Sequence, residues 1–166
     1  MNNEYCFNHR WCFEASREQI LDVLFDVQSY PSWWVPVCIE SRLIERGDEN
    51  KVGLRAAMVT RGRMPYQMEW EFVVQRHDVG KSVTFELFGD AVGEATWSFC
   101  ERETLCEVEL DWTIRAEHLL LKRFSWLLRP AFQHNHCWSM QQGEKGLCAE
   151  VKRRARQRKE LTGAYW

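Results

Sequence analysis

The chain has 166 residues, of which 45% are hydrophobic and 13% aromatic, and its formal net charge at pH 7 is −2. This length suits one domain with a substantial core, so we expect a single domain over residues 1–166. The charge argues against a nucleic-acid-binding domain, which would be strongly basic. No apolar run is long enough to span a bilayer and the first residues lack a signal-peptide pattern, so we expect a cytoplasmic protein.

The first predicted elements are a strand and short helices. Residues 5–13 alternate between large apolar and polar side chains, which is typical of a strand. Ser16 and Gln19 have the spacing of a capping box, so a helix should begin there and end before Pro31. We expect one more helical turn at residues 32–36.

Six further segments resemble strands, because apolar and polar residues alternate along them. Their ranges are 39–46, 52–61, 65–77, 81–88, 93–101 and 105–115. One polar and one apolar face per strand is typical of an antiparallel sheet that is covered on one side.

After residue 118 the apolar period becomes helical. A short apolar piece should end at Arg129, and Pro130 suits the first turn of a longer helix, where its missing N–H is not needed. One stripe of that helix should pack on the sheet. It consists of Phe132, His136, Met140, Gly143, Leu147 and Val151.

The element order predicts an α+β fold, in which a curved seven-stranded antiparallel sheet wraps around a long C-terminal helix, with short helices after the first strand. One helix cannot fill a large concave aromatic face, so we expect a cavity between them. The helix ends in a basic tail, at about residues 152–166. It could contact anionic lipid or nucleic acid, but we favour solvated cations that complement the helix dipole.

The order of these elements and of several motifs resembles the START/Bet v 1-like (SRPBCC) superfamily, with its helix-grip fold, and within it the bacterial polyketide cyclase/dehydrase proteins. The similarity runs over nearly the whole chain. It is carried by WCFEASREQILDVLFDVQSYPSWW, VG at 52–53, PYQMEW at 65–70, GDAVGEATWSF at 89–99, DW at 111–112 and LRPAFQHNHCWSMQQGEKGL at 128–147. The resemblance implies binding of hydrophobic small molecules or lipids between sheet and helix, and only some members of the superfamily are enzymes.

The inward-facing residues form a candidate ligand site. We expect the ligand to contact Trp11, Tyr66, Met68, Trp70, Phe85, Trp97, Trp112, Phe132, His136, Met140 and Gly143. Gly143 indicates either a close approach to the sheet or room for a ligand. Trp33 and Trp34 should lie at the cavity mouth, where they could admit a ligand or contact a membrane, although a rigid plug is favoured.

Three inward polar groups could act in catalysis: His136, His9 and Tyr66. A cavity histidine could hydrogen-bond a ligand or move a proton, but we favour a His136 that bonds a backbone carbonyl or a neighbouring side chain. His134 and His136 point about 200° apart on a helix, so they cannot share a metal. A His134–Cys137 pair lacks further ligands, and we expect no metal and no cofactor.

The preferred hypothesis is therefore a domain that binds a hydrophobic small molecule. The alternative is a cofactor-independent cyclase or dehydratase that uses His136, His9 or Tyr66 as general acid or base. A third hypothesis is an interaction module that contacts a membrane or a protein through Trp33, Trp34 and the tail. We expect no nucleic-acid partner and do not favour membrane contact; the sequence leaves the ligand and the oligomeric state open.

Overall fold

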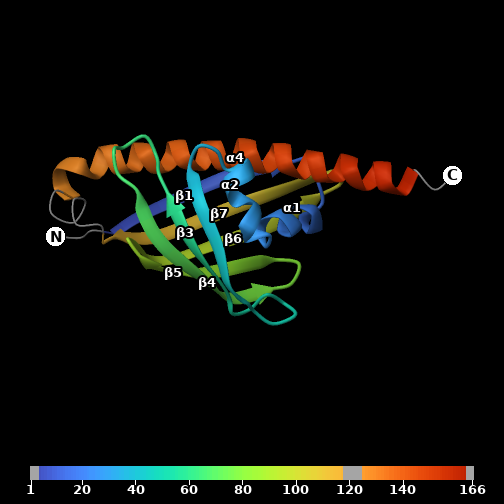
Figure 1. Cartoon of the computed structure of the whole chain (residues 1–166), viewed down its shortest axis with the longest axis horizontal. Coiled ribbons are helices and arrows are strands. Elements are labelled where there is room, and N and C mark those ends of the chain that lie inside the picture. Colours follow the sequence, from blue (N-terminus) through green and yellow to red (C-terminus); the bar gives the residue numbers. More distant parts are fainter. Residues whose placement is uncertain (1–3, 118–124, 164–166) are drawn as a thin grey trace.

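A computed structural model describes residues 4–117 and 125–163 of the chain. Seven antiparallel strands form one sheet with the order β1-β7-β6-β5-β4-β3-β2. Figure 1 shows this sheet curving beneath one long helix, α4. The strands are β1 (Glu4–Phe13), β2 (Cys38–Arg46), β3 (Leu54–Thr60), β4 (Met68–Asp78), β5 (Ser82–Gly89), β6 (Ala91–Arg102) and β7 (Leu105–Ala116). The predicted architecture is confirmed, and each strand lies within three residues of its expected bounds.

Short helices connect β1 to β2. Helix α1 (Arg17–Leu24) begins at the predicted capping box, in which the Ser16 hydroxyl accepts a bond from the Gln19 N–H and the Gln19 side chain accepts one from the Ser16 N–H. A 3₁₀ turn, η1 (Val27–Ser29), and helix α2 (Tyr30–Trp33) follow. The prediction of one helix that continues until just before Pro31 is therefore wrong: α1 ends at Leu24, and Pro31 lies in the first turn of α2, where its missing N–H is tolerated.

Helix α4 (Ser125–Gly163) has 39 residues, about 58 Å at 1.5 Å per residue, and extends beyond the sheet at its C-terminal end (Figure 1). The expected break at Arg129 is wrong, because Pro130 lies inside the helix. Pro130 is exposed and close to the helix N-terminus, so its ring meets solvent rather than core. Residues 118–124 of the apolar piece lie outside the described residues.

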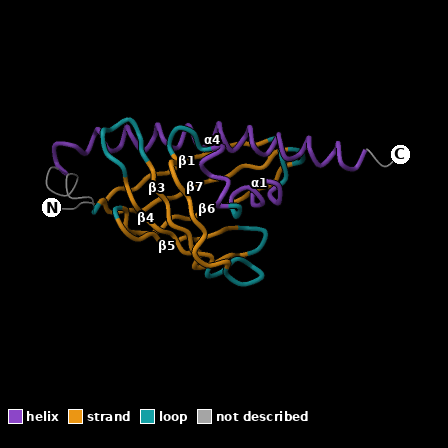
Figure 2. The backbone as a smooth tube through the Cα atoms, viewed as in Figure 1, coloured by secondary structure: helices purple, strands orange, loops and turns teal. Residues whose placement is uncertain are grey.

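The core lies between the concave face of the sheet and α4. Alternate strand residues are buried, as the period of two predicts, among them Phe72 and Val74 on β4 and Val108 and Leu110 on β7. Along α4, Phe132, Met140, Gly143, Leu147 and Val151 are buried and His136 is half-buried, so the predicted stripe is confirmed. Figure 2 shows the loop between β3 and β4 reaching up to α4.

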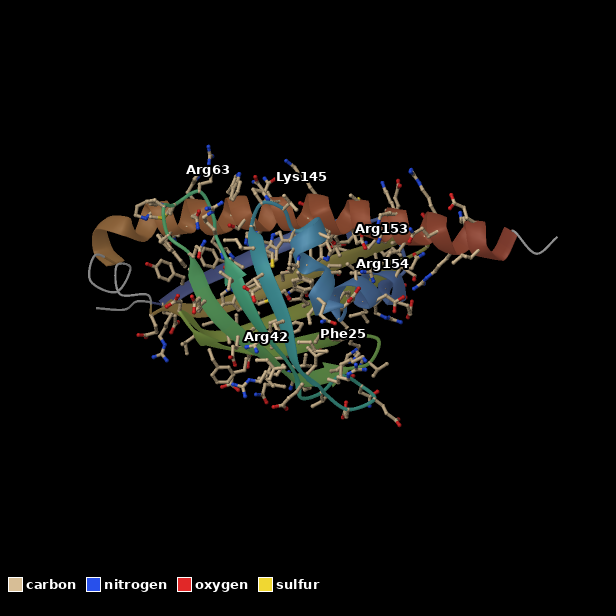
Figure 3. All side chains as sticks on the ribbon, in the orientation of Figure 1. Phe25, Arg42, Arg63, Lys145, Arg153 and Arg154 are labelled. Carbon is tan, nitrogen blue, oxygen red and sulfur yellow. The ribbon has the colours of Figure 1, made fainter. Side chains whose placement is uncertain are left out.

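The basic part of α4 is paired within the fold. Glu150 is buried, and its carboxylate accepts hydrogen bonds from Arg153 and Arg154 at 2.7 Å. Arg154 also reaches Asp26 at 2.6 Å, and Arg158 binds Asp22 on α1. In Figure 3 Arg153 and Arg154 lie on the side of α4 that faces α1. Arg153 and Arg158 remain exposed to solvent, as expected, whereas Arg154 is partly buried; Arg154 and Arg158 tie α4 to α1 and to the segment that follows it.

Candidate functional site

Two adjoining cavities lie between the sheet and α4. The first, here the aromatic lobe, is lined by Trp11, Tyr30, Trp33, Trp34, Trp70, Phe72, Phe85, Leu87, Ala95, Trp97, Trp112, Met140 and Gly143. The second, the polar lobe, is lined by Trp34, Val37, Thr60, Gly62, Tyr66, Met68, Trp70, Leu87, Ala91, Trp112, Ile114, Phe132, Asn135, His136, Ser139 and Met140. Five residues belong to both walls, so the lobes form one divided space.

Both lobes have room for small molecules. The space that a water-sized molecule can occupy is about 50 Å³ in the aromatic lobe and about 80 Å³ in the polar lobe. Roughly 10–15 Å³ of such space suffices for one water. The aromatic side chains therefore do not fill the interior completely, and space for several water-sized molecules remains between sheet and helix.

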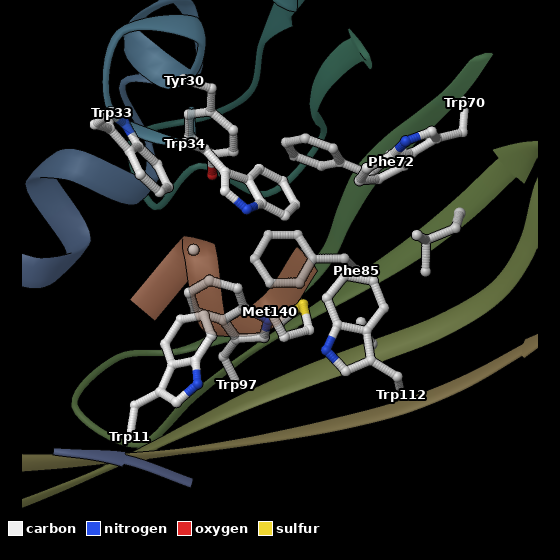
Figure 4. Close-up of a pocket in the computed structure, with 13 residues that line it drawn as sticks. Trp11, Tyr30, Trp33, Trp34, Trp70, Phe72, Phe85, Trp97, Trp112 and Met140 are labelled. Carbon is white, nitrogen blue, oxygen red and sulfur yellow. The ribbon is translucent and has the colours of Figure 1, made fainter. Parts of the chain in front are cut away.

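Edge-to-face contacts fix the rings of the aromatic lobe. The ring centroids of Trp11 and Trp97 are 5.7 Å apart at 78°, and those of Phe85 and Trp97 are 6.1 Å apart at 68°. Phe72 meets Phe85 at 5.5 Å and 86°. Figure 4 shows these side chains converging from the sheet on Met140. Tilted pairs of this kind are favourable, so the rings pack into a continuous apolar surface.

Several polar groups of the polar lobe have partners within the protein. The Trp70 indole N–H donates to the Thr60 hydroxyl at 2.9 Å. The Tyr66 hydroxyl contacts the Met64 sulfur at 3.7 Å. Asn135, which is buried on α4, accepts a 2.6 Å bond from the backbone N–H of Arg63 and holds the β3–β4 loop on the helix. These groups are structural supports of the wall.

Two residues of the same wall have nitrogens that remain unpaired. Trp112 Nε1 and His136 Nε2 are buried without a hydrogen-bond partner among the described residues, and so is His9 Nε2. The His136 ring stacks on Phe7 with centroids 3.9 Å apart, and lies 5.6 Å from Trp112 and 5.4 Å from His9. The expected bond of His136 to a backbone carbonyl or a neighbouring side chain is therefore not made by Nε2, which faces aromatic rings where the helix meets the sheet.

The titratable groups of the cavity are neutral at pH 7. Burial, with a smaller effect of His9, lowers the pKa of His136 to about 3. Burial raises the pKa of Tyr66 to about 12 and that of Tyr30 further above its usual value. Burial also lowers the pKa of His9. Each shift has the direction that desolvation imposes on the charged form.

Trp33 and Trp34 form a cover over the cavity. Their rings are stacked with centroids 6.2 Å apart at 14°, and both lie in the wall of the aromatic lobe. The Trp34 indole donates to the Ser139 carbonyl on α4 at 2.9 Å, and the Trp33 indole donates to the Ser29 hydroxyl at 3.1 Å. Figure 4 shows both side chains facing the rings of the sheet. The cover is thus fastened to the helix.

Glycines on α4 allow this cover to pack closely. A Cβ added to Gly146 would lie 1.9 Å from the Trp33 carbonyl oxygen, and one added to Gly143 would lie 3.0 Å from Trp34 Nε1. The tight neighbour of Gly143 is therefore Trp34 of the cover rather than the sheet, where Trp11 lies at an ordinary contact distance of 3.5 Å, and Gly143 also lines the aromatic lobe.

The structure brings most of the predicted residues together. All eleven expected ligand-contacting residues, and both tryptophans of the expected mouth, line one or both lobes. His9 lies beside His136 but not in either wall. Asn135, Ser139 and Tyr30 were not predicted, because each depends on how a loop or the cover meets α4. In the sequence, these three residues are marked as site residues only by their positions within a few residues of His136 or Trp33.

His134 and Cys137 are exposed, and the described residues hold no group of three or more metal-binding side chains. Among the described residues, no helix has the length and apolar character needed to cross a membrane.

A family model described as polyketide cyclase/dehydrase and lipid transport matches residues 13–137. Solved structures with similar folds include a START superfamily protein from Mycobacterium smegmatis, with TM-score 0.70, 14% identity and coverage of 89% of this chain and 97% of that one. An aromatase/cyclase from a Streptomyces species has TM-score 0.71 and 12% identity over 92% and 96%. A STAR-related lipid transfer protein from Xanthomonas axonopodis has TM-score 0.57 and 14% identity over 89% and 85%. No curated protein sequence matches this chain.

Proposed function

Because the chain belongs to the polyketide cyclase/dehydrase and lipid transport family, we propose that it binds a hydrophobic small molecule in the divided cavity between the sheet and α4. One observation carries this proposal. Apolar and aromatic side chains enclose space that they do not fill, and the polar groups within reach are few. This combination is typical of small-molecule binding sites.

A cavity-filling variant tests the proposal. Ala95 lies in the wall of the aromatic lobe and is 1% exposed, so Ala95→Leu should occupy ligand space. Ala149→Leu, on the exposed side of α4, is the matched control. Native mass spectrometry of protein purified from its own host should show a bound small molecule in the parent and in Ala149→Leu, and much less in Ala95→Leu. A bare protein mass in all three, or equal loading in all three, would contradict cavity binding.

The second candidate is a cyclase- or dehydratase-type enzyme that uses His136, His9 or Tyr66. The unpaired His136 Nε2 favours a contact with a substrate. A pKa of about 3, however, makes His136 a weak base at neutral pH, and Tyr66 with a pKa of about 12 is a donor rather than a base. These values favour hydrogen bonding over proton transfer. Single replacements of His136, His9 and Tyr66 by Phe test the enzyme: unchanged turnover in all three would exclude it.

Neither membrane nor nucleic-acid binding is favoured by the charges on α4. The arginines nearest the fold are paired with Glu150, Asp26 and Asp22, which leaves less free positive charge. Co-sedimentation with anionic liposomes should therefore show no retention of the intact chain. We also propose that the protein is located in the cytoplasm.

A further inference from the structure

In the part of the chain that the structure describes, no charged side chain lines either lobe. None of the residues that line them is Asp, Glu, Lys or Arg, and the titratable ones are neutral at pH 7 for the reasons given above. A charged ligand group would lose its hydration there without gaining a counter-ion, at a cost of several kcal/mol. The cavity therefore suits an uncharged ligand.

The indole N–H of Trp112 is a buried donor that has no partner among the described residues. Trp34 and Trp70 also lie at the boundary of the lobes, but their N–H groups are bonded to Ser139 and Thr60. Trp112 Nε1 has no such partner among the described residues, and in Figure 4 the nitrogen edge of its ring is turned toward Met140 and the interior. An indole N–H can only donate, so its partner must be an acceptor.

The His136 ring, which carries a second unpaired nitrogen, lies beside the Trp112 ring with centroids 5.6 Å apart. Its ring is held by stacking on Phe7 and meets the Trp112 ring at 75°. Because the imidazole is neutral, it adds hydrogen-bonding capacity without adding charge. Burying an unpaired polar group costs roughly 1–3 kcal/mol, so a ligand that pairs these nitrogens recovers that loss on binding.

We propose that Trp112 and His136 form the recognition site for the polar end of the ligand, and that the ligand is an uncharged hydrophobic molecule with a hydrogen-bond-accepting oxygen, such as a ketone. The Trp112 N–H donates to this oxygen, and so does His136 in the neutral tautomer that carries its proton on Nε2. The apolar body of the ligand occupies the aromatic lobe. This inference rests on the proposed function and specifies the ligand that the cavity selects.

Two ligands of matched shape test the inference. 2-Acetonaphthone carries a ketone oxygen, and 2-isopropenylnaphthalene replaces it with a CH₂ group. Calorimetric titration should show that the parent protein binds the ketone about fivefold more tightly, as one hydrogen bond of about 1 kcal/mol implies. 2-Naphthoate, which is charged at pH 7, should bind much more weakly than the ketone.

The variant Trp112→Phe removes the N–H and keeps an aromatic ring. The preference for the ketone over the alkene should then fall to about one. Trp97→Phe is the matched control, because it removes an indole from another part of the aromatic lobe. It should lower the affinity for both ligands by the same factor. His136→Phe should reduce the preference while keeping a ring on Phe7.

A readout in the unmodified protein avoids any dependence on folding of the variants. With ¹⁵N-labelled tryptophan, the indole proton signal of Trp112 should move downfield with 2-acetonaphthone but not with the alkene. Equal affinities for ketone and alkene in the parent protein would overturn the recognition site while leaving cavity binding intact. A ketone preference that persists in Trp112→Phe would also overturn it. Absence of binding by both ligands would count against the proposed function itself.

Discussion

The indole nitrogen of Trp34 donates a 2.9 Å hydrogen bond to the backbone carbonyl of Ser139, and this bond joins the cover of the cavity to the helix that carries His136. Trp34 lines both lobes, so a ligand that passes between cover and helix must disturb this contact. The bond is therefore a candidate for the rate-limiting contact in ligand exchange.

Trp34→Phe should accelerate ligand exchange. The substitution removes the bond to Ser139, which should lower the free energy of unfolding by about 1 kcal/mol and raise both association and dissociation rates of 2-acetonaphthone severalfold. Stopped-flow measurement gives both rates. Trp33→Phe is the control, since its lost bond is to Ser29 on the same side of the cavity. Dissociation rates that respond equally to both substitutions would show that the Ser139 bond has no special role.

Gly146→Ala should destabilise the protein more than Gly143→Ala. At Gly146 the new Cβ would lie 1.9 Å from the Trp33 carbonyl, which is backbone and cannot turn away, whereas at Gly143 the nearest atom is 3.0 Å away on the Trp34 side chain. We expect Gly146→Ala to lower the free energy of unfolding by about 1–3 kcal/mol and Gly143→Ala to change it less, as measured by urea unfolding. Helix propensity alone would stabilise both by about 1 kcal/mol, so a more stable Gly146→Ala would disprove the close packing.

Glu150→Gln should reduce stability in a pH-dependent manner. Hydrogen bonds from Arg153, and then from Arg154, lower the pKa of Glu150 from 4.5 to about 2. Its contribution is therefore fully present above about pH 4.5 and is lost as the pH falls toward 2. At pH 7 the free energy of unfolding of Glu150→Gln should be roughly 2 kcal/mol lower than that of the parent. The two free energies should converge as the pH falls toward 2.

Glu144→Gln on the same helix is the control for Glu150→Gln. Burial raises the pKa of Glu144, so replacing it should not destabilise the protein at pH 7. Urea unfolding between pH 2 and pH 7 compares the three proteins. A constant difference between parent and Glu150→Gln over this range would contradict the carboxylate pairing.

His136→Phe should make the protein relatively more resistant to acid. The imidazole titrates near 6.5 when unfolded and near 3 when folded, so the unfolded state binds more protons between these values. Stability of the parent should then fall with decreasing pH by up to about 1.4 kcal/mol per pH unit, a loss that the variant lacks. Unfolding measured from pH 7 to pH 4, with the histidine proton signals followed by NMR, tests this. A folded His136 that titrates near 6.5 would contradict it.

The sheet and its inward face could be predicted because a strand has a period of two. That alternation alone predicts that Trp70, Trp97 and Trp112 face the cavity, and all three line the aromatic lobe. Helix ends were harder: Pro130 suited a first turn, but the helix begins earlier at Ser125. The pairing of Glu150 with Arg153 and Arg154 follows from their helical spacing, but the contact of Arg154 with Asp26 could not be predicted, because it joins residues that meet only in the folded chain. The division of the cavity likewise depends on where Trp34 meets α4.

Because Trp34 and Trp112 lie at the boundary of the two lobes, intrinsic tryptophan fluorescence should report ligand binding. Indole emission responds to the polarity and hydrogen bonding around the ring, and one of these rings is fastened to Ser139 while the other has a free N–H. Occupation of either lobe therefore alters the surroundings of at least one of these two fluorophores. Ligand libraries can be screened on the unlabelled chain, and the Trp34→Phe and Trp112→Phe proteins show which ring reports each compound.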